Sequence, residues 1–106
     1  SGAERLVLLV AKMIREDFLH QNAFHDVDTY TSIEKQYNMI KVIIYFYNQA
    51  LDFLNMGVDI RKIEKMKVME HIARMKYVED KYLNKITGIE QEIDAEFAEL
   101  KQQEQN

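Results

Sequence analysis

The stretch TSIEKQYNMIKVIIYFYNQALDFLNMG, residues 31–57, decides the fold of this chain. Its apolar residues recur at alternating spacings of four and three, which is the spacing of one face of an α-helix. The first stripe comprises Ile33, Tyr37, Ile40, Ile44, Tyr47, Leu51 and Leu54. A second stripe comprises Met39, Ile43, Phe46, Ala50 and Phe53. A helix with two apolar faces packs against neighbours on two sides, so we predict the central helix of a bundle.

Both ends of this helix carry start and stop signals. Thr31 followed by Glu34 fits a capping box, in which the hydroxyl and the carboxylate each satisfy a free backbone N–H group. Gly57 predicts the C-terminal stop, because glycine enters the left-handed conformation without the penalty of a Cβ atom. Asp59 stands where it can cap the next helix.

The flanking segments also have helical spacing. Residues 4–21 predict a first helix with Val7, Val10, Ile14 and Phe18 on one face, and with first turns that are apolar almost all round. Residues 59–77 contain a phase slip near 65–67, which indicates two short helices or one kinked helix. Residues 79–103 predict a last helix. Its apolar face is Tyr82, Ile86, Ile89, Ile93, Phe97 and Leu100, and its far face is acidic, with Glu90, Glu92, Asp94, Glu96 and Glu99.

The fold class that follows is all-α, an antiparallel helical bundle of about four helices whose third region is kinked or split. A chain of 106 residues suits one domain with one modest core. We expect residues 1–3 to be a cloning scar, residues 4–103 to form the single bundle domain, and residues 104–106 to be a frayed polar tail.

Composition excludes several functions. The formal net charge of −4, without any block of lysine or arginine, argues against nucleic acid as a partner. The longest apolar run, residues 6–11, is far too short to insert across a bilayer. The chain has no cysteine, so it has neither disulfides nor thiolate chemistry. With only three glycines it cannot form a P-loop or a dinucleotide fingerprint, so by itself it is no P-loop nucleotide hydrolase.

The segment DFLHQNAFHDVDTY, residues 17–30, is predicted to interrupt the helices. His25, Asp26 and Asp28 lie too close together along a loop to converge on a metal ion, so a solvated loop is favoured and no metal site is expected. No spacing suggests a catalytic triad or a carboxylate pair, so no catalytic residue is expected. His20 near a helix C-terminus would interact favourably with the helix dipole when protonated. Phe24 is either a lid on the local core, which the residues alone favour, or a stacking platform for something planar.

Two longer stretches resemble a known family. REDFLHQNAFHDVDTYTSIEKQY, residues 15–37, resembles the C-terminal helical domain of the catalytic A subunit of V-type and archaeal or bacterial A/V-type rotary ATPases, and IARMKYVED, residues 72–80, is similar to a second stretch of that domain. Proline near Asp26 and cysteine near Thr31, which some members carry, are absent here. The resemblance covers nearly the whole chain.

The resemblance implies a function. A weaker similarity to the beta subunit of F-type ATPases matches Phe18 and Leu19, Gln21 and Phe24 to an FL…Q…F pattern in which the last phenylalanine contacts adenine. Phe24 is therefore expected to contact the adenine of ATP or ADP in the intact enzyme, while Mg²⁺ and the phosphates are held by residues outside this chain. The domain would act as a lever that presses on the central stalk as nucleotide binds and leaves.

The resemblance also implies partners: the rest of the A subunit, neighbouring B subunits and the central stalk, in a cytoplasmic head peripheral to the membrane. The chain alone is expected to be inactive and to hold no cofactor, and it is expected to self-associate if residues 6–11 have lost a covering partner. A free-standing helical interaction module stays open as the alternative. A metal- or cofactor-binding bundle is a third reading, for which the sequence shows no ligand set.

Overall fold

The computed structural model describes residues 1–24, 29–77 and 82–106, with side chains described for residues 1–21, 33–77 and 85–106. Within that part of the chain every regular element is an α-helix, which confirms the predicted all-α class. The helices are α1 (Gly2–Phe24), α2 (Thr29–Asn55), α3 (Ile60–Glu64), α4 (Val68–Met75) and α5 (Tyr82–Gln105). The third region is split into α3 and α4, as the phase slip near residues 65–67 predicts.

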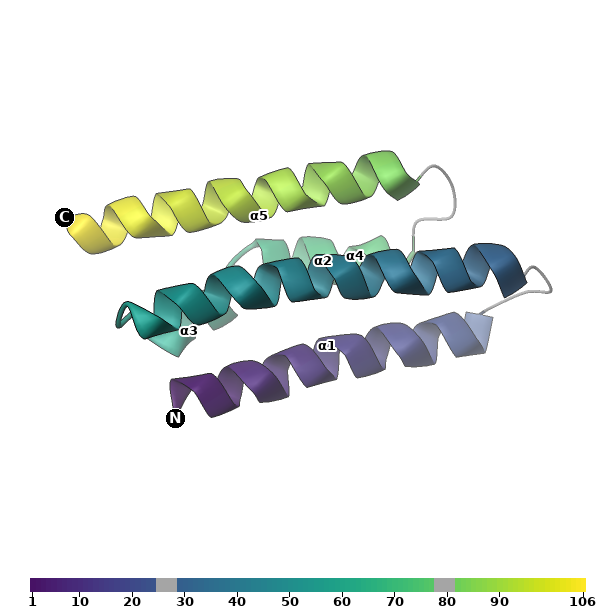
Figure 1. Cartoon of the computed structure of the whole chain (residues 1–106), viewed down its shortest axis with the longest axis horizontal. Helices are drawn as coiled ribbons and strands as arrows, with labels where there is room; N and C mark the ends of the chain where they lie inside the picture. Colours follow the sequence, from purple (N-terminus) through teal and green to yellow (C-terminus); the bar gives the residue numbers. More distant parts are fainter. Residues whose placement is uncertain (25–28, 78–81) are drawn as a thin grey trace.

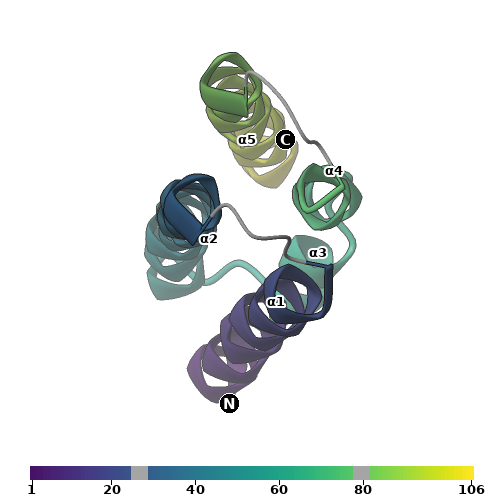
Figure 2. The same ribbon diagram turned by 90° about the vertical axis from the view of Figure 1, so that its right-hand side faces the viewer.

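The helices form a flat, elongated bundle that measures 51 × 27 × 16 Å. Figure 1 shows α1, α2 and α5 side by side, with α3 and α4 behind them, and both chain termini at the same end of the bundle. Helices α1 and α2 run in opposite directions, whereas α2 and α5 run in the same direction (Figure 1). The end-on view in Figure 2 places α5 beside α2 and α4, on the other side of the bundle from α1. Helix α2 therefore lies between α1 and α5.

The core includes residues of all five helices, with Leu6 and Val10 from α1 and Ile60 and Ile63 from α3 buried beside those of α2, α4 and α5. The second stripe of α2 is buried as predicted, and so is the apolar face of α5 from Ile86 to Leu100. The ring of Phe97 lies 5.8 Å from that of Phe46 and 4.9 Å from that of Phe53, centroid to centroid. Two stripes that sequence spacing identifies thus meet along one seam.

The corner between α2 and α3 has the geometry that its sequence predicts. Gly57 has φ of 95°, in the left-handed region. Its N–H donates to the carbonyl of Leu54, and the N–H of Val58 donates to that of Phe53, both at 3.0 Å, which is the Schellman pattern that closes a helix. Asp59 then caps α3 by accepting from the N–H of Arg61 at 2.9 Å. Hydrogen bonds from Arg61 hold the pKa of Asp59 well below its usual range.

Several helix boundaries differ from the predicted ones. Helix α1 continues to Phe24, so the expected interruption does not begin at residue 17. Helix α2 begins at Thr29, which places Thr31 within its first turn, and a capping box at Thr31 therefore does not start the helix. Helix α5 continues to Gln105, so residues 104 and 105 of the expected frayed tail are helical. At the other end α1 starts at Gly2, within the residues set aside as a scar.

The predicted inward face of α1 is also displaced. Leu6, Val10, Asp17 and Gln21 are the buried residues, whereas Val7 is 53% and Phe18 is 51% exposed. Successive residues on a helix are about 100° apart, so choosing Phe18 over Asp17 turns the expected face toward solvent. The prediction failed because hydrophobicity favours the phenylalanine, while the fold buries the carboxylate.

The first stripe of α2 does not have the neighbour that was predicted for it. Ile33 and Tyr37 are 67% and 66% exposed, and Ile40 and Ile44 are exposed as well. Only the later members of the stripe, Tyr47, Leu51 and Leu54, are partly buried against the core. The N-terminal half of α2 therefore presents an apolar face with no cover from the described residues.

Candidate functional site

The predicted nucleotide-side residue, Phe24, is the last residue of α1. Its side chain lies outside the described part of the chain, as do His25, Asp26 and Asp28. Phe18, Leu19 and Gln21 of the FL…Q…F pattern all lie on α1 rather than in a loop. The pattern thus sits on the last turns of a helix, with Gln21 buried and with Phe18 and Leu19 exposed.

Three segments meet near this end of the bundle. The ring of His20 on α1 stands edge-on to that of Tyr77, with 5.0 Å between centroids. The ammonium of Lys35 on α2 donates to the carbonyl oxygen of Lys76 at 2.8 Å. The ammonium of Lys76 lies 5.5 Å from the centre of the Tyr77 ring. These contacts tie the C-terminal part of α1 and the start of α2 to the segment after α4.

The surroundings of His20 weaken the interaction with the helix dipole that was expected for its protonated form. Burial, together with the nearby ammonium groups of Lys76 and Lys35, lowers the pKa of His20 below its ordinary value. The protonated form, which alone would gain from the helix dipole, is therefore disfavoured.

Asp17 and Gln21 form a buried polar pair that the sequence reasoning missed. Asp17 is 4% exposed, and among the described residues no hydrogen-bond partner is found for its carboxylate oxygens or for the Gln21 amide nitrogen. Burial raises the pKa of Asp17, and the neighbouring side chain of Gln21 and the charges of Lys35, His20 and Lys76 partly offset that rise. The signal was available, since Leu6, Val10, Met13, Asp17 and Gln21 continue one face at helical spacing.

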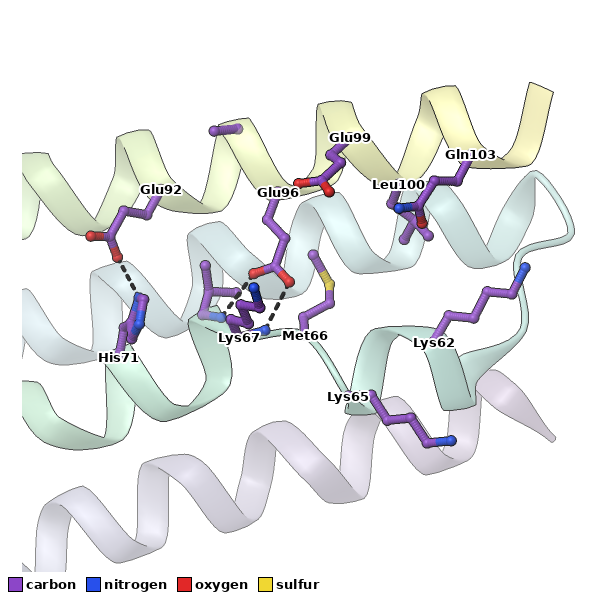
Figure 3. A pocket seen from close by; sticks show the side chains of 12 residues that line it. Lys62, Lys65, Met66, Lys67, His71, Glu92, Glu96, Glu99, Leu100 and Gln103 are labelled. Carbon is purple, nitrogen blue, oxygen red and sulfur yellow. Dashed lines mark hydrogen bonds and ion pairs between the residues drawn. The ribbon is translucent and has the colours of Figure 1, made fainter. Parts of the chain in front are cut away.

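An open groove of about 520 Å³ lies between α3–α4 and α5. Figure 3 shows Lys62, Lys65 and His71 along one side and Glu92, Glu96 and Glu99 along the other. His71 Nδ1 lies 2.7 Å from a carboxylate oxygen of Glu92, and Lys62 pairs with Glu104 at the same distance. Charged side chains along the groove are therefore already engaged in ion pairs or hydrogen bonds with one another.

Glu96 has a definite structural task in this groove. Its two carboxylate oxygens accept from the backbone N–H groups of Lys67 and Val68, at 2.8 and 2.9 Å (Figure 3). These donors are at the N-terminus of α4, where Lys67 itself forms no side-chain cap. A residue of α5 thus caps α4 from across the groove, where a carboxylate also suits the helix dipole.

The predicted acidic far face of α5 is consequently only partly a solvated face. Besides Glu92 and Glu96, Asp94 turns toward α2, where Tyr45 and Gln49 both donate to its Oδ1 atom at 2.7 Å. The hydrogen bond to Asp94 raises the pKa of Tyr45 to about 12. Carboxylates that sequence spacing assigned to solvent instead join α5 to two other helices.

Two further features are absent from the described residues. Among the described residues there is no group of three or more histidine, cysteine, aspartate or glutamate side chains that could hold a metal ion. None of the helices in that same part of the chain is long and apolar enough to cross a membrane.

Comparison with known proteins identifies the family to which the module belongs. Residues 1–64 match the family described as the C-terminal domain of V and A type ATP synthase, and the chain belongs to that family. The match extends through α1, α2 and α3.

Relatives from bacteria and archaea agree with this assignment. The V-type ATP synthase alpha chain of Thermoanaerobacter sp. (strain X514) is 58% identical over 93 residues, which are 88% of this chain and 16% of the relative. That of Clostridioides difficile (strain 630) is 50% identical over 101 residues, 94% of this chain and 17% of the relative. The A subunit of the A-type ATP synthase of Methanopyrus kandleri is 50% identical over 99 residues, 92% of this chain and 17% of the relative. The chain therefore spans about a sixth of the length of the relatives it matches.

Proposed function

We propose that this chain is the C-terminal domain of the catalytic subunit of a rotary, ion-translocating ATP synthase or ATPase, in which it completes the adenine side of the nucleotide pocket and transmits conformational change to the central stalk. The observation that carries the proposal is the family match over residues 1–64, which includes the whole of α1 and the segment that follows it. The names of the relatives, V-type and A-type ATP synthase subunits, give the same parentage.

The architecture suits a lever. Helix α1 has 23 residues, so it is about 34 Å long, at about 1.5 Å per residue, and it ends at Phe24. A shift of the nucleotide pocket at Phe24 would move a helix that packs along α2 for much of its length. Packed helices move as a body, while the strain of a domain movement is absorbed at hinges elsewhere. A displacement of one end of the bundle would thus be transmitted to its other end.

The division of chemistry follows from the composition. An adenine ring requires a flat apolar face, which Phe24 can supply to any base. Phosphate and Mg²⁺ require a glycine-rich loop and acidic or hydroxyl ligands, and a chain with three glycines has no such loop. ATP, ADP and Mg²⁺ would therefore be bound chiefly by the rest of the subunit, and the 106 residues alone should neither bind nor hydrolyse ATP.

The proposed partners are the rest of the A subunit, the neighbouring B subunits and the central stalk subunits. The paired charges of the groove in Figure 3 give no preference among them. The partly uncovered α1–α2 face is the part of the surface that most needs a partner.

The adenine contact is tested by replacing Phe24 with alanine in the assembled enzyme. Base stacking on an aromatic ring contributes about 1–3 kcal/mol, so the KM for ATP should rise about 5- to 150-fold. Phe24→Tyr keeps a ring and should stay near the wild-type value, while Leu8→Ala, at an exposed position far along α1, serves as the control. An unchanged KM in a correctly folded Phe24→Ala enzyme would remove Phe24 from the pocket.

A further inference from the structure

Side chains of α1 and α2 meet at the end of α4, in what we call the α4 junction. It comprises His20 of α1, Lys35 of α2, and Lys76 and Tyr77, which directly follow α4. In Figure 1 the last turns of α1, the first turns of α2 and the end of α4 lie toward the same end of the bundle. Helix α1 ends there at Phe24, the residue of the proposed adenine contact. The junction is therefore at the end of the bundle where the proposed function requires precise placement.

Side chains of two other helices bind the backbone at the end of α4. The ammonium of Lys35 donates to the carbonyl oxygen of Lys76 at 2.8 Å. The ring of His20 also forms a hydrogen bond with the backbone of Lys76, and this bond acts to raise the pKa of His20. A hydrogen bond has that effect on histidine when the ring is the donor, so a backbone carbonyl accepts it. Carbonyl groups at the C-terminus of a helix lack partners within it, so α1 and α2 together cap α4.

His20 is also fixed by its packing. Its ring stands edge-on to that of Tyr77, with 5.0 Å between centroids and 83° between the ring planes. Burial and the ammonium groups of Lys76 and Lys35 lower the pKa of His20, so the ring is mostly neutral at neutral pH. A neutral imidazole keeps one N–H group and can still donate. His20 therefore anchors α1 by a hydrogen bond and a ring contact, neither of which requires a charge on the ring.

Helix α4 is a suitable fixed point for this anchor. Val68, Ile72 and Met75 are buried in the core along its length. Its N-terminus is capped from α5 by Glu96, which accepts from two backbone N–H groups at 2.8 and 2.9 Å. Because α4 is held in the core and at its N-terminus, a side chain bound to its other end is held in turn.

The anchor lies one helical turn before the end of α1. His20 is four residues before Phe24, and residues at that spacing lie one above the other on the same side of a helix. The end turns of helices fray, because their last carbonyl groups have no partner within the helix. An anchor at His20 therefore restricts the direction in which the last turn of α1 points, and with it the position of Phe24.

We propose that His20 is a positioning residue for the nucleotide pocket: by anchoring the end of α1 to the α4 junction, it holds Phe24 where that residue meets the adenine ring. The inference rests on the proposed function, because it takes the contact between Phe24 and adenine as given. It adds a residue that touches no nucleotide and acts through Phe24. It also gives α4 a task, as the fixed point against which the end of α1 is set.

The first test measures ATP hydrolysis by the assembled enzyme. His20→Ala should raise the KM for ATP about fivefold, the size expected for the loss of one net hydrogen bond, and should change kcat less than about twofold. His20→Gln keeps an N–H donor and should return the KM to within about twofold of the wild-type value. His71→Ala is the matched control, at a histidine of α4 that pairs with Glu92 instead, and should leave the KM unchanged.

Two further measurements separate positioning from a general loss of structure. In an enzyme that already carries Phe24→Ala, His20→Ala should have no further effect on the KM, because the two residues act as one unit. The inhibition constant of ribose 5′-triphosphate, which has no base to stack, should be the same for His20→Ala and wild type. Additive effects of the two replacements, or weaker inhibition of His20→Ala by ribose 5′-triphosphate, would overturn the proposal.

Hydrogen exchange of the assembled enzyme without nucleotide tests the anchor itself. The amides of residues 21–24 should exchange at least about tenfold faster in His20→Ala than in wild type, while those of residues 8–14 of the same helix are unchanged. Equal exchange in the two enzymes would overturn the proposal. So would faster exchange with an unchanged KM, in an enzyme whose KM does respond to Phe24→Ala.

The same data distinguish a failure of this inference from a failure of the proposed function. If Phe24→Ala leaves the KM unchanged while His20→Ala still speeds exchange at residues 21–24, the adenine contact is wrong and the anchor is right. If Phe24→Ala raises the KM while His20→Ala changes neither the KM nor the exchange, the adenine contact is right and the anchor is wrong.

Discussion

The two sides of this bundle satisfy their polar groups very differently. On the side where α5 packs on α2 and α4, the carboxylates of Glu92, Asp94 and Glu96 each have a partner on another helix. At the α1–α2 pair, apolar residues of both helices are exposed, and the carboxylate of Asp17 is buried with no hydrogen-bond partner among the described residues. The carboxylates of α5 therefore stabilise contacts between helices, whereas the burial of Asp17 opposes folding.

The largest change in stability is expected on the side where α5 packs on α2. Phe97→Ala removes a ring that packs between Phe46 and Phe53, and it should cost about 3–5 kcal/mol of the free energy of unfolding, as aromatic-to-alanine changes in cores do. Tyr37→Ala, at an exposed position of α2, should change the free energy of unfolding by less than about 0.5 kcal/mol. Urea unfolding of the two variants measures the contrast. Similar losses would mean that the two sides are equally packed.

The next largest effect on stability is expected from the buried carboxylate of Asp17, and it depends on pH. The pKa of Asp17 is raised in the folded state, so the folded state retains its proton at a higher pH than the unfolded one. The contribution of this carboxyl to stability is fully present below its ordinary pKa, and it is lost as pH rises through the folded value. The groups that face it are Lys35 of α2, Lys76 after α4 and His20 of α1.

Asp17→Asn should therefore stabilise the 106-residue chain by about 1–3 kcal/mol at pH 7, the usual cost of an unsatisfied buried group, and by much less near pH 3.5. Chemical unfolding at the two pH values checks this expectation. A gain of the same size at both would show that the charge of Asp17 is not what destabilises the fold.

A smaller effect tests the cap that joins α5 to α4. Glu96→Ala leaves the N–H groups of Lys67 and Val68 without an acceptor and should cost about 1 kcal/mol, the typical value for losing a helix cap. Glu99→Ala, one turn further along the same groove, is the matched control and should be nearly neutral. If the two losses are equal, Glu96 acts only as one charge among several.

Much of the fold could be predicted from the sequence because local signals and packing agree. The second stripe of α2, the Gly57 stop, the Asp59 cap and the split between α3 and α4 all depend on spacing or on backbone preferences within a few residues. The structure confirms each of them.

The sequence could not place the residues whose role depends on distant partners. Asp17 is polar, so a pattern of hydrophobic residues alone passes over it, although its spacing continues the buried face of Leu6 and Val10. Glu96 is 28 residues from Val68, and no local rule links them. The capping box predicted at Thr31 is wrong for a different reason. The residues fit the capping pattern, but the helix already starts at Thr29, so Thr31 lies within its first turn. The contact of Phe24 with adenine comes from family resemblance and stays a prediction.

The most direct test of the lever is a pair of distances in the assembled enzyme. Spin labels on Lys12 of α1 and Gln91 of α5 report the shape of the bundle, and labels on Gln91 and the central stalk report its position. On binding nucleotide, the first distance should stay constant while the second shifts by more than about 2 Å, the size of a domain rearrangement. A constant distance to the stalk, or a bundle that deforms internally instead, would contradict the account.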